Sequence, residues 1–418
     1  MSIKKTKIVH ISTSIYGGAG IAAYRIHLAL LAQGVNSLFL SLNNTELIKD
    51  CSIQSKNKSL IEKLINKIKW RLKFHFNIIV DRKERFIYSL DKISPLLNCE
   101  IATLPFSNYD VLKHSACQDA DIIHLHWVAG ILDYTTFFKN NIKPVVWTLH
   151  DLNAFQGIFH YKNDEIVNED FTRKFDNHIS NLKTKILKNR KCNLSIVSPS
   201  KWLLEKANNS IVFSNIKSLC IYNPIDNIFF ENVGTLIDKK SLGISADSTI
   251  FLFVSQNVKN YRKGYDLMIE ALKKVANKSI TLLVIGEMKK IDIPEINIIF
   301  LGSVVDNNFL KHYYSIADAF ILPSREDNLP NVMLESLACG TPVLSFNVGG
   351  MAEIIKDGFN GLKAKEINEN DLAKTILNFI KNKHQYCSAE IKTEAYNLFN
   401  NLGIANEYIK IYKTVLDN

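Results

Sequence analysis

The sequence lacks the features that mark membrane-spanning, disulfide-stapled and repetitive proteins. In its 418 residues, no uninterrupted apolar run approaches the roughly 20 residues that a membrane-spanning helix needs. There is no internal repeat and no low-complexity tail. The seven cysteines are odd in number and scattered without paired spacing, which indicates reduced thiols. The opening residues MSIKKTKIVHIST pass from lysines directly into an apolar strand and leave no room for a signal peptide, so we expect a cytoplasmic protein.

What the chain does have is the composition of an ordinary soluble globular protein. Hydrophobic residues make up 47% of the chain and charged residues 22%, which is enough apolar material for a sizeable core. A length of 418 residues is natural for two domains of about 200 residues each. The composition therefore favours a two-domain protein without specifying its activity.

The formal net charge of +10 is concentrated in one segment. Between residues 56 and 85, ten Lys or Arg residues stand against three carboxylates, a local net charge of +7. The run KNKSLIEKLINKIKWRLKF repeats its apolar residues at helical spacing and places lysines on the other face. Such a helix can lie on an anionic membrane surface, and it can equally pack on the core with a solvated basic face. No aromatic-interleaved motif accompanies the charge, so we expect no nucleic-acid partner.

Two series of alternating strands and helices follow one another along the chain. In the first series, apolar strands are expected at residues 7–13, 35–42, 121–127, 144–150, 193–200 and 218–224. The second series has its strands at residues 249–256, 281–287, 297–304, 317–322 and 342–346. Strand–helix–strand units form right-handed crossovers between parallel strands, so each series predicts a doubly wound α/β domain with a Rossmann-like sheet.

These two series set the expected domain boundaries. Residues 1–224 form the first domain, which carries the basic segment as an insertion at about 56–90. The mostly polar stretch 225–247 is interpreted as a linker, and residues 248–400 form the second domain. A last helical stretch occupies residues 401–418.

The most informative run is ILPSREDNLPNVMLESLACGTPVLSFNVGGMAE, at residues 321–353. An apolar strand ends in a polar loop at residues 324–330, and a helical segment follows at 331–338. Strand, loop and helix in this order place the loop at the carboxyl edge of a parallel sheet, where open α/β sheets bind ligands. Asp327 lies in the loop and Glu335 in the helix. Two carboxylates beside free backbone N–H groups suit a ligand that carries both sugar hydroxyls and phosphates.

This run resembles the donor-binding signature of family-4 glycosyltransferases of the GT-B fold, which pair two acids at this spacing. The resemblance covers nearly the whole chain, strongest from Asn257 to Ala364 and weaker from Ile8 to Trp202. It departs at Asp327, where the family usually has Glu. It implies two Rossmann-like domains that face each other across a cleft, with residues 401–418 crossing back onto the first domain.

The resemblance also implies an activity and a set of site residues. It implies a retaining hexosyltransferase that moves a sugar from a UDP- or GDP-linked donor to a growing surface glycan, such as capsule, O-antigen or exopolysaccharide. Glu335 would hold the ribose hydroxyls, and Gly302 with Ser303 would line the base pocket. The donor sugar would be held by one acid and the loop that follows it, namely Asp327, Asn328, Leu329, Pro330 and Asn331. Retaining members need neither a metal nor an enzymic nucleophile, so no cofactor is expected.

Gly17, Gly18 and Gly20 follow the first strand and open a helix. Glycines let a phosphate approach the backbone, and a helix N-terminus supplies N–H donors and positive potential. The run GAGIAA also satisfies a loose dinucleotide fingerprint, which requires an acid about 20 residues later. Asn43 and Asn44 stand there instead, so a nicotinamide cofactor is disfavoured. Comparable glycine loops in family-4 enzymes imply a contact with the donor diphosphate or the acceptor.

Three further residues are candidates for catalysis. His150 ends an apolar strand, where it can hydrogen-bond a sugar hydroxyl or stabilise developing charge. The corresponding histidine of similar enzymes touches the donor sugar, whereas a structural histidine is the alternative, and His160 in the same loop is a weaker candidate. Arg262 and Lys263 follow the second domain's first strand, where two cations can neutralise a leaving diphosphate. Family-4 enzymes usually separate this Arg from the Lys, so a solvated surface pair remains the alternative.

A metal site and two other functions are alternatives to this interpretation. His124 and His126 alternate along one strand and face the same side, as two zinc ligands would, but no Cys, Glu or third His follows at ligand spacing. No metal is therefore expected. A GT-B sugar-nucleotide epimerase would also bind the nucleotide, but without an acceptor. A non-catalytic, membrane-associated nucleotide-sugar-binding protein would use the basic segment while its cleft stayed idle. A lipid-linked oligosaccharide acceptor would give peripheral attachment to the inner face of the plasma membrane a purpose.

Overall fold

The computed structural model describes residues 6–42, 68, 81–232, 239–257, 260–275, 279–287 and 293–417. Most of the basic insertion expected at about 56–90 falls in the gap between residues 42 and 81, so its amphipathic helix lies outside the described residues. None of the helices in the described ranges is long and apolar enough to cross a membrane.

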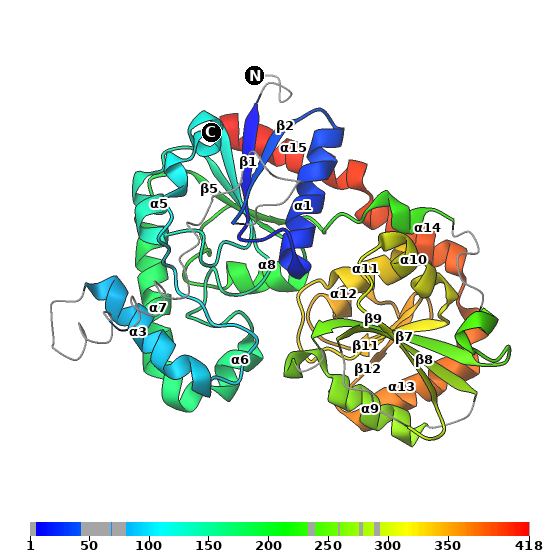
Figure 1. The fold of residues 1–418 in the computed structure, drawn as a ribbon. Coiled ribbons are helices and arrows are strands. Elements are labelled where there is room, and N and C mark those ends of the chain that lie inside the picture. The colour runs from blue at the N-terminus through cyan, green and yellow to red at the C-terminus, as the bar shows by residue number, and fades with distance from the viewer. Residues whose placement is uncertain are drawn as a thin grey trace.

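The first domain is built on a six-stranded sheet in the order β2-β1-β3-β4-β5-β6 (Figure 1). Neighbouring strands all pair in parallel. The strands are β1 (Lys7–Ile11), β2 (Asn36–Leu40), β3 (Ile122–Leu125), β4 (Val145–Thr148), β5 (Leu194–Ser198) and β6 (Ser218–Cys220). The central strands β3, β4 and β5 are buried along their whole length, which is why their sequences are continuous apolar runs rather than alternating ones.

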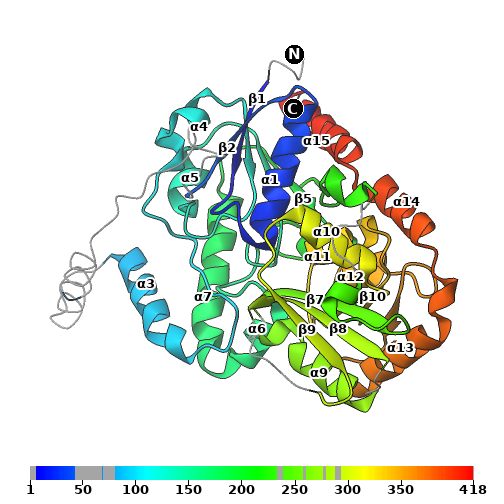
Figure 2. The same cartoon turned by 45° about the vertical axis from the view of Figure 1, so that its right-hand side comes forward.

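Helices cover both faces of this sheet. The helices of this domain are α1 (Gly17–Ala32), α3 (Arg82–Ile93), α4 (Ser115–Asp119), α5 (Tyr134–Asn140), α6 (Lys162–Val167), α7 (Glu169–Lys188) and α8 (Lys201–Asn208), of which α3 lies beside α7 and away from the sheet (Figures 1 and 2). Local signals set their ends; α8, for example, begins where the Ser200 side chain accepts a hydrogen bond from the backbone N–H of Leu203. Leu187 of α7 and Leu203 of α8 pack with Trp147 on one face of the sheet.

The second domain repeats the plan with a six-stranded sheet in the order β12-β11-β10-β7-β8-β9. The strands, again parallel, are β7 (Thr249–Asn257), β8 (Ile280–Glu287), β9 (Asn297–Gly302), β10 (Ala319–Leu322), β11 (Val343–Phe346) and β12 (Gly361–Ala364). Its helices are α9 (Tyr265–Lys274), α10 (Asn307–Ile316), α11 (Asn331–Ala338), α12 (Met351–Ile354), α13 (Glu369–Asn382) and α14 (Ser388–Phe399). Short 3₁₀ turns complete the two domains: η3 (Ser94–Leu96), η4 (Val111–Lys113), η5 (Asn227–Phe230), η6 (Lys239–Leu242), η7 (Tyr261–Lys263) and η8 (Lys383–Gln385).

The order of strands reverses between β1 and β3 in the first sheet and between β7 and β10 in the second. Ligands of open α/β sheets bind outside the carboxyl ends of strands at such a reversal. The loops after β1, β7 and β10 therefore occupy the favoured positions, and these are the loops that carry the predicted glycines, cations and acids. The predicted architecture of two doubly wound Rossmann-like domains is confirmed.

The last helix, α15 (Asn401–Asp417), leaves the second domain and packs on the first. Its Tyr408 and Tyr412 are fully buried in one cluster with Ile8 of β1 and Ile26 of α1. Figures 1 and 2 both show this red helix beside the blue α1. Just before α15, a single parallel bridge joins Ile225 to Asn400 where the chain passes between the domains. The end of the chain thus completes the core of the first domain.

The glycine run lies inside the first helix. Gly17, Gly18 and Gly20 open a helix as predicted, and α1 begins at Gly17. The packing requires a glycine at position 20, because a Cβ atom there would lie 2.5 Å from the carbonyl oxygen of Ser14. Gly17 itself has a φ of +73°, which L side chains rarely adopt. Close backbone approach therefore outweighs the low helix propensity of glycine.

Candidate functional site

Asp327 lies in a buried position in the loop between β10 and α11. Its Oδ2 atom is 2.6 Å from Nζ of Lys263 and 3.1 Å from a guanidinium nitrogen of Arg262. Burial opposes ionisation of this carboxyl, but the two cations hold its pKa below the usual value. Gly349 packs against the same loop so closely that a Cβ atom would lie 1.8 Å from the Asp327 carbonyl oxygen. The structure therefore brings three of the predicted site residues together as one ionised cluster.

Arg262 is only 3% exposed, which contradicts the solvated-surface alternative for this residue. Its Nε atom donates to Glu100 at 3.0 Å, and Nη1 donates to the Glu326 carbonyl oxygen at 2.9 Å. Its guanidinium also lies 3.8 Å from the ring centroid of Tyr161, at cation–π distance. Arg262 therefore ties the loop at residues 324–330, called the donor loop below, to residues of the first domain. Lys263, with 27% of its side chain exposed, is the cation that remains open to a ligand.

Glu335 projects from α11 and is also buried. Its Oε1 accepts a hydrogen bond of 2.9 Å from Nη2 of Arg25, a residue of α1 in the first domain. Arg25 also donates through Nε to Asp226 at 3.0 Å, and Tyr314 donates to the other oxygen of Glu335 at 3.4 Å. The acid expected to hold ribose hydroxyls is thus engaged by a buried cation in this structure. The sequence analysis did not predict Arg25 as a site residue, because no motif marks it within an ordinary helical run.

The donor loop meets the first domain through its amide side chains. Asn328 donates to the carbonyl oxygen of His150 at 3.1 Å and accepts from the Ser200 hydroxyl. Asn331, at the first turn of α11, donates to the carbonyl oxygen of Gly18 at 2.9 Å. The N-terminus of α11 therefore lies against the glycine run that begins α1, and both helix ends direct N–H groups to this region.

The remaining predicted donor-site residues have different surroundings. Leu329 is buried in the core of the second domain, and Pro330 is the N-cap residue of α11. Gly18 is exposed and Gly17 half-buried, whereas Gly20 is buried. Gly302 and Ser303 are exposed at the carboxyl end of the edge strand β9.

Two glutamates of the second domain reach across to helix N-termini of the first. Glu326 accepts hydrogen bonds from the backbone N–H groups of Lys162, at 3.1 Å, and Asn163, at 2.9 Å. Glu353 accepts from those of Lys201, at 3.0 Å, and Trp202, at 3.2 Å. A carboxylate at a helix N-terminus is stabilised by the free N–H groups and the helix dipole. These contacts hold the carboxyl edges of the two sheets against each other.

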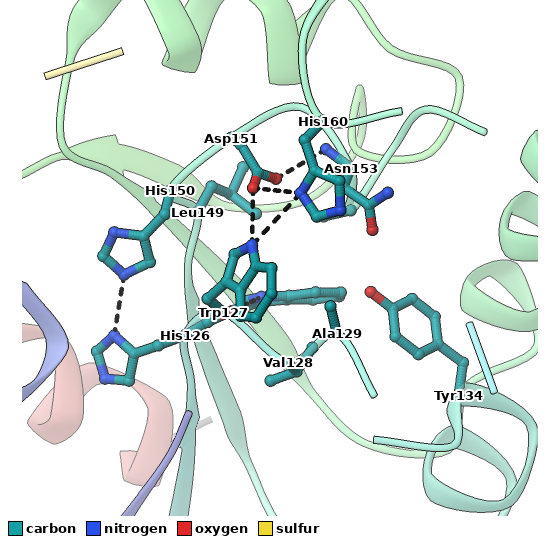
Figure 3. Close-up of a pocket in the computed structure, with 12 residues that line it drawn as sticks. His126, Trp127, Val128, Ala129, Tyr134, Leu149, His150, Asp151, Asn153 and His160 are labelled. Atoms are coloured by element: carbon teal, nitrogen blue, oxygen red, sulfur yellow. Dashed lines mark hydrogen bonds and ion pairs between the residues drawn. The ribbon is translucent and has the colours of Figure 1, made fainter. Parts of the chain in front are cut away.

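His150 lies just beyond the end of β4, beside the donor loop. Burial lowers its pKa to about 4, although the neighbouring Asp151 carboxylate opposes this shift. Its Nε2 atom lies 3.4 Å from Nδ1 of His126, and Figure 3 shows the two rings turned away from Asp151 and His160. His150 is therefore a neutral imidazole, and its ring belongs to a different group of side chains from the acid that follows it.

His160 is a satisfied structural histidine in this structure. Its Nδ1 atom lies 2.6 Å from Asp151 (Figure 3). Its Nε2 atom lies 2.9 Å from the Thr103 hydroxyl. Trp127 donates to the same Asp151 oxygen at 2.9 Å. The adjoining cavity of about 20 Å³ has room for one water molecule but not for a sugar. Asp151 therefore organises the loop after β4.

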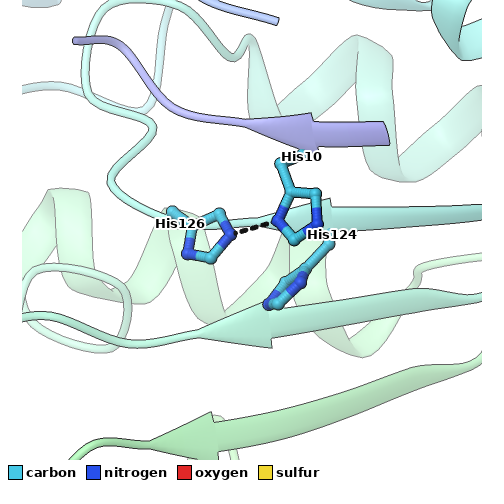
Figure 4. A group of neighbouring side chains, drawn as sticks. All are labelled: His10, His124 and His126. Carbon is cyan, nitrogen blue, oxygen red and sulfur yellow. Dashed lines mark hydrogen bonds between the residues drawn. The ribbon is translucent and has the colours of Figure 1, made fainter. Parts of the chain in front are cut away.

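A third histidine joins His124 and His126, contrary to our expectation. It is His10, which pairs directly with His124 in the register of β1 and β3, so all three rings lie on one face of the sheet (Figure 4). One ring nitrogen from each lies within 4.8 Å of the others. The sequence shows no third histidine at ligand spacing after β3, because the third one comes from the neighbouring strand β1.

The three rings are already hydrogen-bonded within the protein. His124 is 2.7 Å from the Tyr412 hydroxyl and 2.8 Å from that of Thr148. His10 Nδ1 and His126 Nε2 lie 2.9 Å apart. Among the described residues, only Nε2 of His10 lacks a partner in this cluster. A metal held by three of these nitrogens would have to break several of the bonds, so the donor set does not favour one.

Comparison with known protein families matches residues 235–396 to a family model described as glycosyl transferases group 1. An uncharacterized glycosyltransferase of Methanocaldococcus jannaschii is 27% identical over 241 residues, which are 53% of this chain and 60% of that protein. An uncharacterized 41.2 kDa protein in the cps region of Klebsiella pneumoniae is 24% identical over 78% of this chain and 85% of its own. For the first three relatives matched, the chain spans only about half to three-fifths of their length.

Solved structures resemble the whole chain. Sucrose-phosphate synthase from Thermosynechococcus elongatus superposes with a TM-score of 0.68 at 18% identity, covering 99% of this chain and all of that one. The Anabaena protein HepE, solved in complex with UDP, has a TM-score of 0.62 at 14% identity and covers 98% of this chain and all of its own. At such identities the similarity establishes the fold, which is shared along the entire chain.

Proposed function

We propose that this protein, whose residues 235–396 match the family model of glycosyl transferases group 1 and whose chain has the GT-B fold, is a retaining glycosyltransferase. In this proposal it moves a sugar from a nucleotide-sugar donor to a growing surface glycan. The observation that carries the proposal is the ionised cluster of Asp327, Lys263 and Arg262 just before the N-terminus of α11, together with Glu335 further along that helix. Cations, a helix N-terminus and carboxylates at one sheet edge suit the diphosphate and the hydroxyls of a nucleotide sugar.

Each part of this cluster has a proposed role. Lys263 meets the departing diphosphate together with the N–H groups at the start of α11, and the glycine run of α1 approaches it from the first domain. Glu335 accepts hydrogen bonds from the ribose hydroxyls, while Asp327 and the loop to Asn331 hold the donor sugar. No enzymic nucleophile is invoked, because stabilisation of the leaving group lets the acceptor hydroxyl attack from the same side.

Two comparisons support the substrate classes without assigning them. HepE was solved with UDP, which favours a UDP-linked donor here, with a GDP-linked donor as the second choice. The Klebsiella relative is described as lying in a cps region, which favours a capsule-type or other surface glycan as the acceptor. A lipid-linked oligosaccharide is the form of acceptor we propose, because it would give the basic segment at residues 56–85 a surface to bind.

The experiment that tests donor binding is a calorimetric titration of the full chain with UDP-, GDP- and ADP-sugars. One nucleotide class should bind at least tenfold more tightly than the other two, since the base pocket has to distinguish them. The same titration with Glu335→Gln should give weaker binding for that class. If none of the three classes binds more tightly than free phosphate, the proposal fails.

We expect turnover to survive removal of divalent cations. Lys263 and the N-terminus of α11 supply positive charge where a metal would otherwise neutralise the diphosphate. The measurement is the initial rate after dialysis against EDTA, compared with the rate after readdition of magnesium or manganese. Rates that agree within twofold support the assignment. Activity that vanishes with EDTA and returns with the metal contradicts the proposed role of Lys263.

We also propose that the basic segment attaches the protein to anionic membrane. Each Lys or Arg near such a surface contributes roughly 1 kcal/mol, so replacing Lys63, Lys67, Lys69 and Lys73 with Gln should release the protein. Co-sedimentation with anionic vesicles measures this, with neutral vesicles as the control. Added salt should weaken wild-type binding, because screening acts within about 8–10 Å at ordinary ionic strength. Wild-type protein that ignores anionic vesicles at low salt would show that the segment has another role.

A further inference from the structure

A chain of three imidazoles runs from the first sheet to the proposed donor site. His10 in β1 and His126, which follows β3, are joined by a hydrogen bond of 2.9 Å between Nδ1 and Nε2 (Figure 4). The other nitrogen of His126, Nδ1, lies 3.4 Å from Nε2 of His150 (Figure 3). The carbonyl oxygen of His150 accepts in turn from Asn328 of the donor loop at 3.1 Å. The chain of imidazoles thus ends beside the donor loop.

All three imidazoles are neutral at physiological pH. Burial lowers the pKa of His10 and His126 well below the usual value, and neighbouring histidines lower it further. Burial also lowers the pKa of His150, to about 4. A neutral imidazole carries one ring proton, so it donates through one nitrogen and accepts through the other. Each bond between two such rings therefore has a direction, and the direction fixes every tautomer along the chain.

The buried end of the chain decides this direction. Nε2 of His10 is shielded from solvent and has no hydrogen-bond partner in the part of the chain that the structure describes. If His126 donated to His10, this nitrogen would carry a buried N–H group with nothing to accept its proton. If His10 donates to His126, the nitrogen carries only an unused lone pair. Buried N–H groups without an acceptor are rarer in protein interiors than buried acceptors without a donor. Donation away from His10 is therefore favoured.

We propose that His10 donates to His126, that His126 donates to His150, and that His150 thereby presents an N–H group at Nδ1. No described residue bonds to that nitrogen. An N–H at this position can donate to a hydroxyl of the donor sugar or to charge that develops on its oxygens. His10 and His126 are then positioning residues that act through His150. The role toward the sugar rests on the proposed glycosyltransferase function, whereas the tautomers do not.

The neighbouring His124 is a matched control for this chain. Its ring centroid lies 4.1 Å from that of His126, so the two share one buried layer. Its own nitrogens, however, bond to Tyr412 and Thr148 and not to any of the three histidines of the chain. A substitution at His124 therefore removes a buried imidazole from the same layer and leaves the three-ring chain intact.

The first test is the tautomer spectrum of the full chain labelled with ¹⁵N-histidine. Two-bond ¹⁵N–¹H correlations separate a protonated ring nitrogen from a bare one, and single His→Phe variants assign the signals. We expect His10, His126 and His150 each to carry their proton on Nδ1. A proton on Nε2 of His150 overturns the proposal. One equivalent of zinc in the purified protein also overturns it, because ligated nitrogens cannot take part in the chain.

The second test compares His126→Phe with His124→Phe. Breaking the chain should leave His150 as a mixture of tautomers and lower kcat/KM about ten- to a hundredfold, since a misplaced group near the reacting atoms has effects of this size. His124→Phe should keep the single tautomer. A His150 signal unchanged in His126→Phe overturns the proposal. If wild type turns over no nucleotide sugar, the proposed function fails while the tautomer result stands. If neither variant folds, the wild-type spectrum decides alone.

Discussion

Replacing Lys263 with alanine is expected to lower kcat about a hundred- to a thousandfold. The Lys263 ammonium lies at the carboxyl end of the second sheet, 2.6 Å from Asp327, and is open enough to meet a ligand. A cation that touches the departing diphosphate binds the transition state more strongly than the ground state, so its loss acts on kcat rather than on KM. Removing one such preorganised donor typically lowers kcat about 10²–10³-fold. The measurement is steady-state kinetics with a saturating acceptor.

Lys273→Ala is the matched control for this variant. Lys273 lies on α9, shortly after Lys263, and forms an exposed ion pair of 2.7 Å with Glu270. Surface pairs of this kind contribute little to stability, so its kinetics should stay at the wild-type level. In Lys263→Ala itself, Asp327 keeps Arg262 at 3.1 Å, which should hold the donor loop in place. A kcat that changes less than threefold would exclude Lys263 from leaving-group stabilisation.

Replacing Glu335 with alanine should weaken nucleotide-sugar binding about ten- to a hundredfold. Ribose hydroxyls would lose a charge-assisted acceptor, an interaction that contributes about 1.5–3 kcal/mol. Tyr314→Phe is the control, because it removes only a 3.4 Å contact to the same carboxylate and leaves the charge in place. Calorimetry on folded protein measures both. Unchanged affinity in Glu335→Ala would remove this acid from the donor site.

The same substitution should also reduce stability, since Glu335 is the 2.9 Å partner of a buried Arg25. A buried charge left with no partner typically costs about 3–5 kcal/mol. Arg25 keeps Asp226 at 3.0 Å in this variant, so the loss of stability should be smaller than that. A second variant, Arg25→Met combined with Glu335→Ala, should recover much of that loss and still bind the donor weakly. Stability and affinity can then be separated. In the wild type, the ribose hydroxyls of a bound donor would have to compete with Arg25 for the Glu335 carboxylate.

The fold and the strand, loop and helix that carry the site could be predicted, because short-range sequence patterns determine them. The apolar strand, the polar loop and the helix at Asn331–Ala338 follow directly from the run at residues 321–353, and the helix has the predicted bounds. Continuous apolar runs separated by helical periods predict buried parallel strands, as found in β3 and β4. Lys263 and Asp327 could be expected at one sheet edge because each follows the carboxyl end of a strand.

The partners of these residues could not be predicted, because they come from distant parts of the chain. Arg25 meets Glu335 across 310 residues, and Glu100 meets Arg262 across 162. Neither Arg25 nor Glu100 stands in a motif that marks it. His10 could have been found only by pairing β1 with β3, since the contact depends on strand register and not on spacing within one segment. Packing between domains therefore decides which predicted side chains are free for a ligand.

The measurement that tests the central claim most directly is product analysis with and without an acceptor. The full chain would be incubated with the nucleotide sugar that it binds best, alone and with a panel of glycan and lipid-linked acceptors. Release of the nucleoside diphosphate and the anomeric configuration of the product would be followed by NMR. A retaining transferase should release the nucleotide only when an acceptor is present and should keep the donor's configuration in the new bond. Acceptor-independent conversion of the donor to an epimer, or tight donor binding with no turnover on any acceptor, would contradict the account.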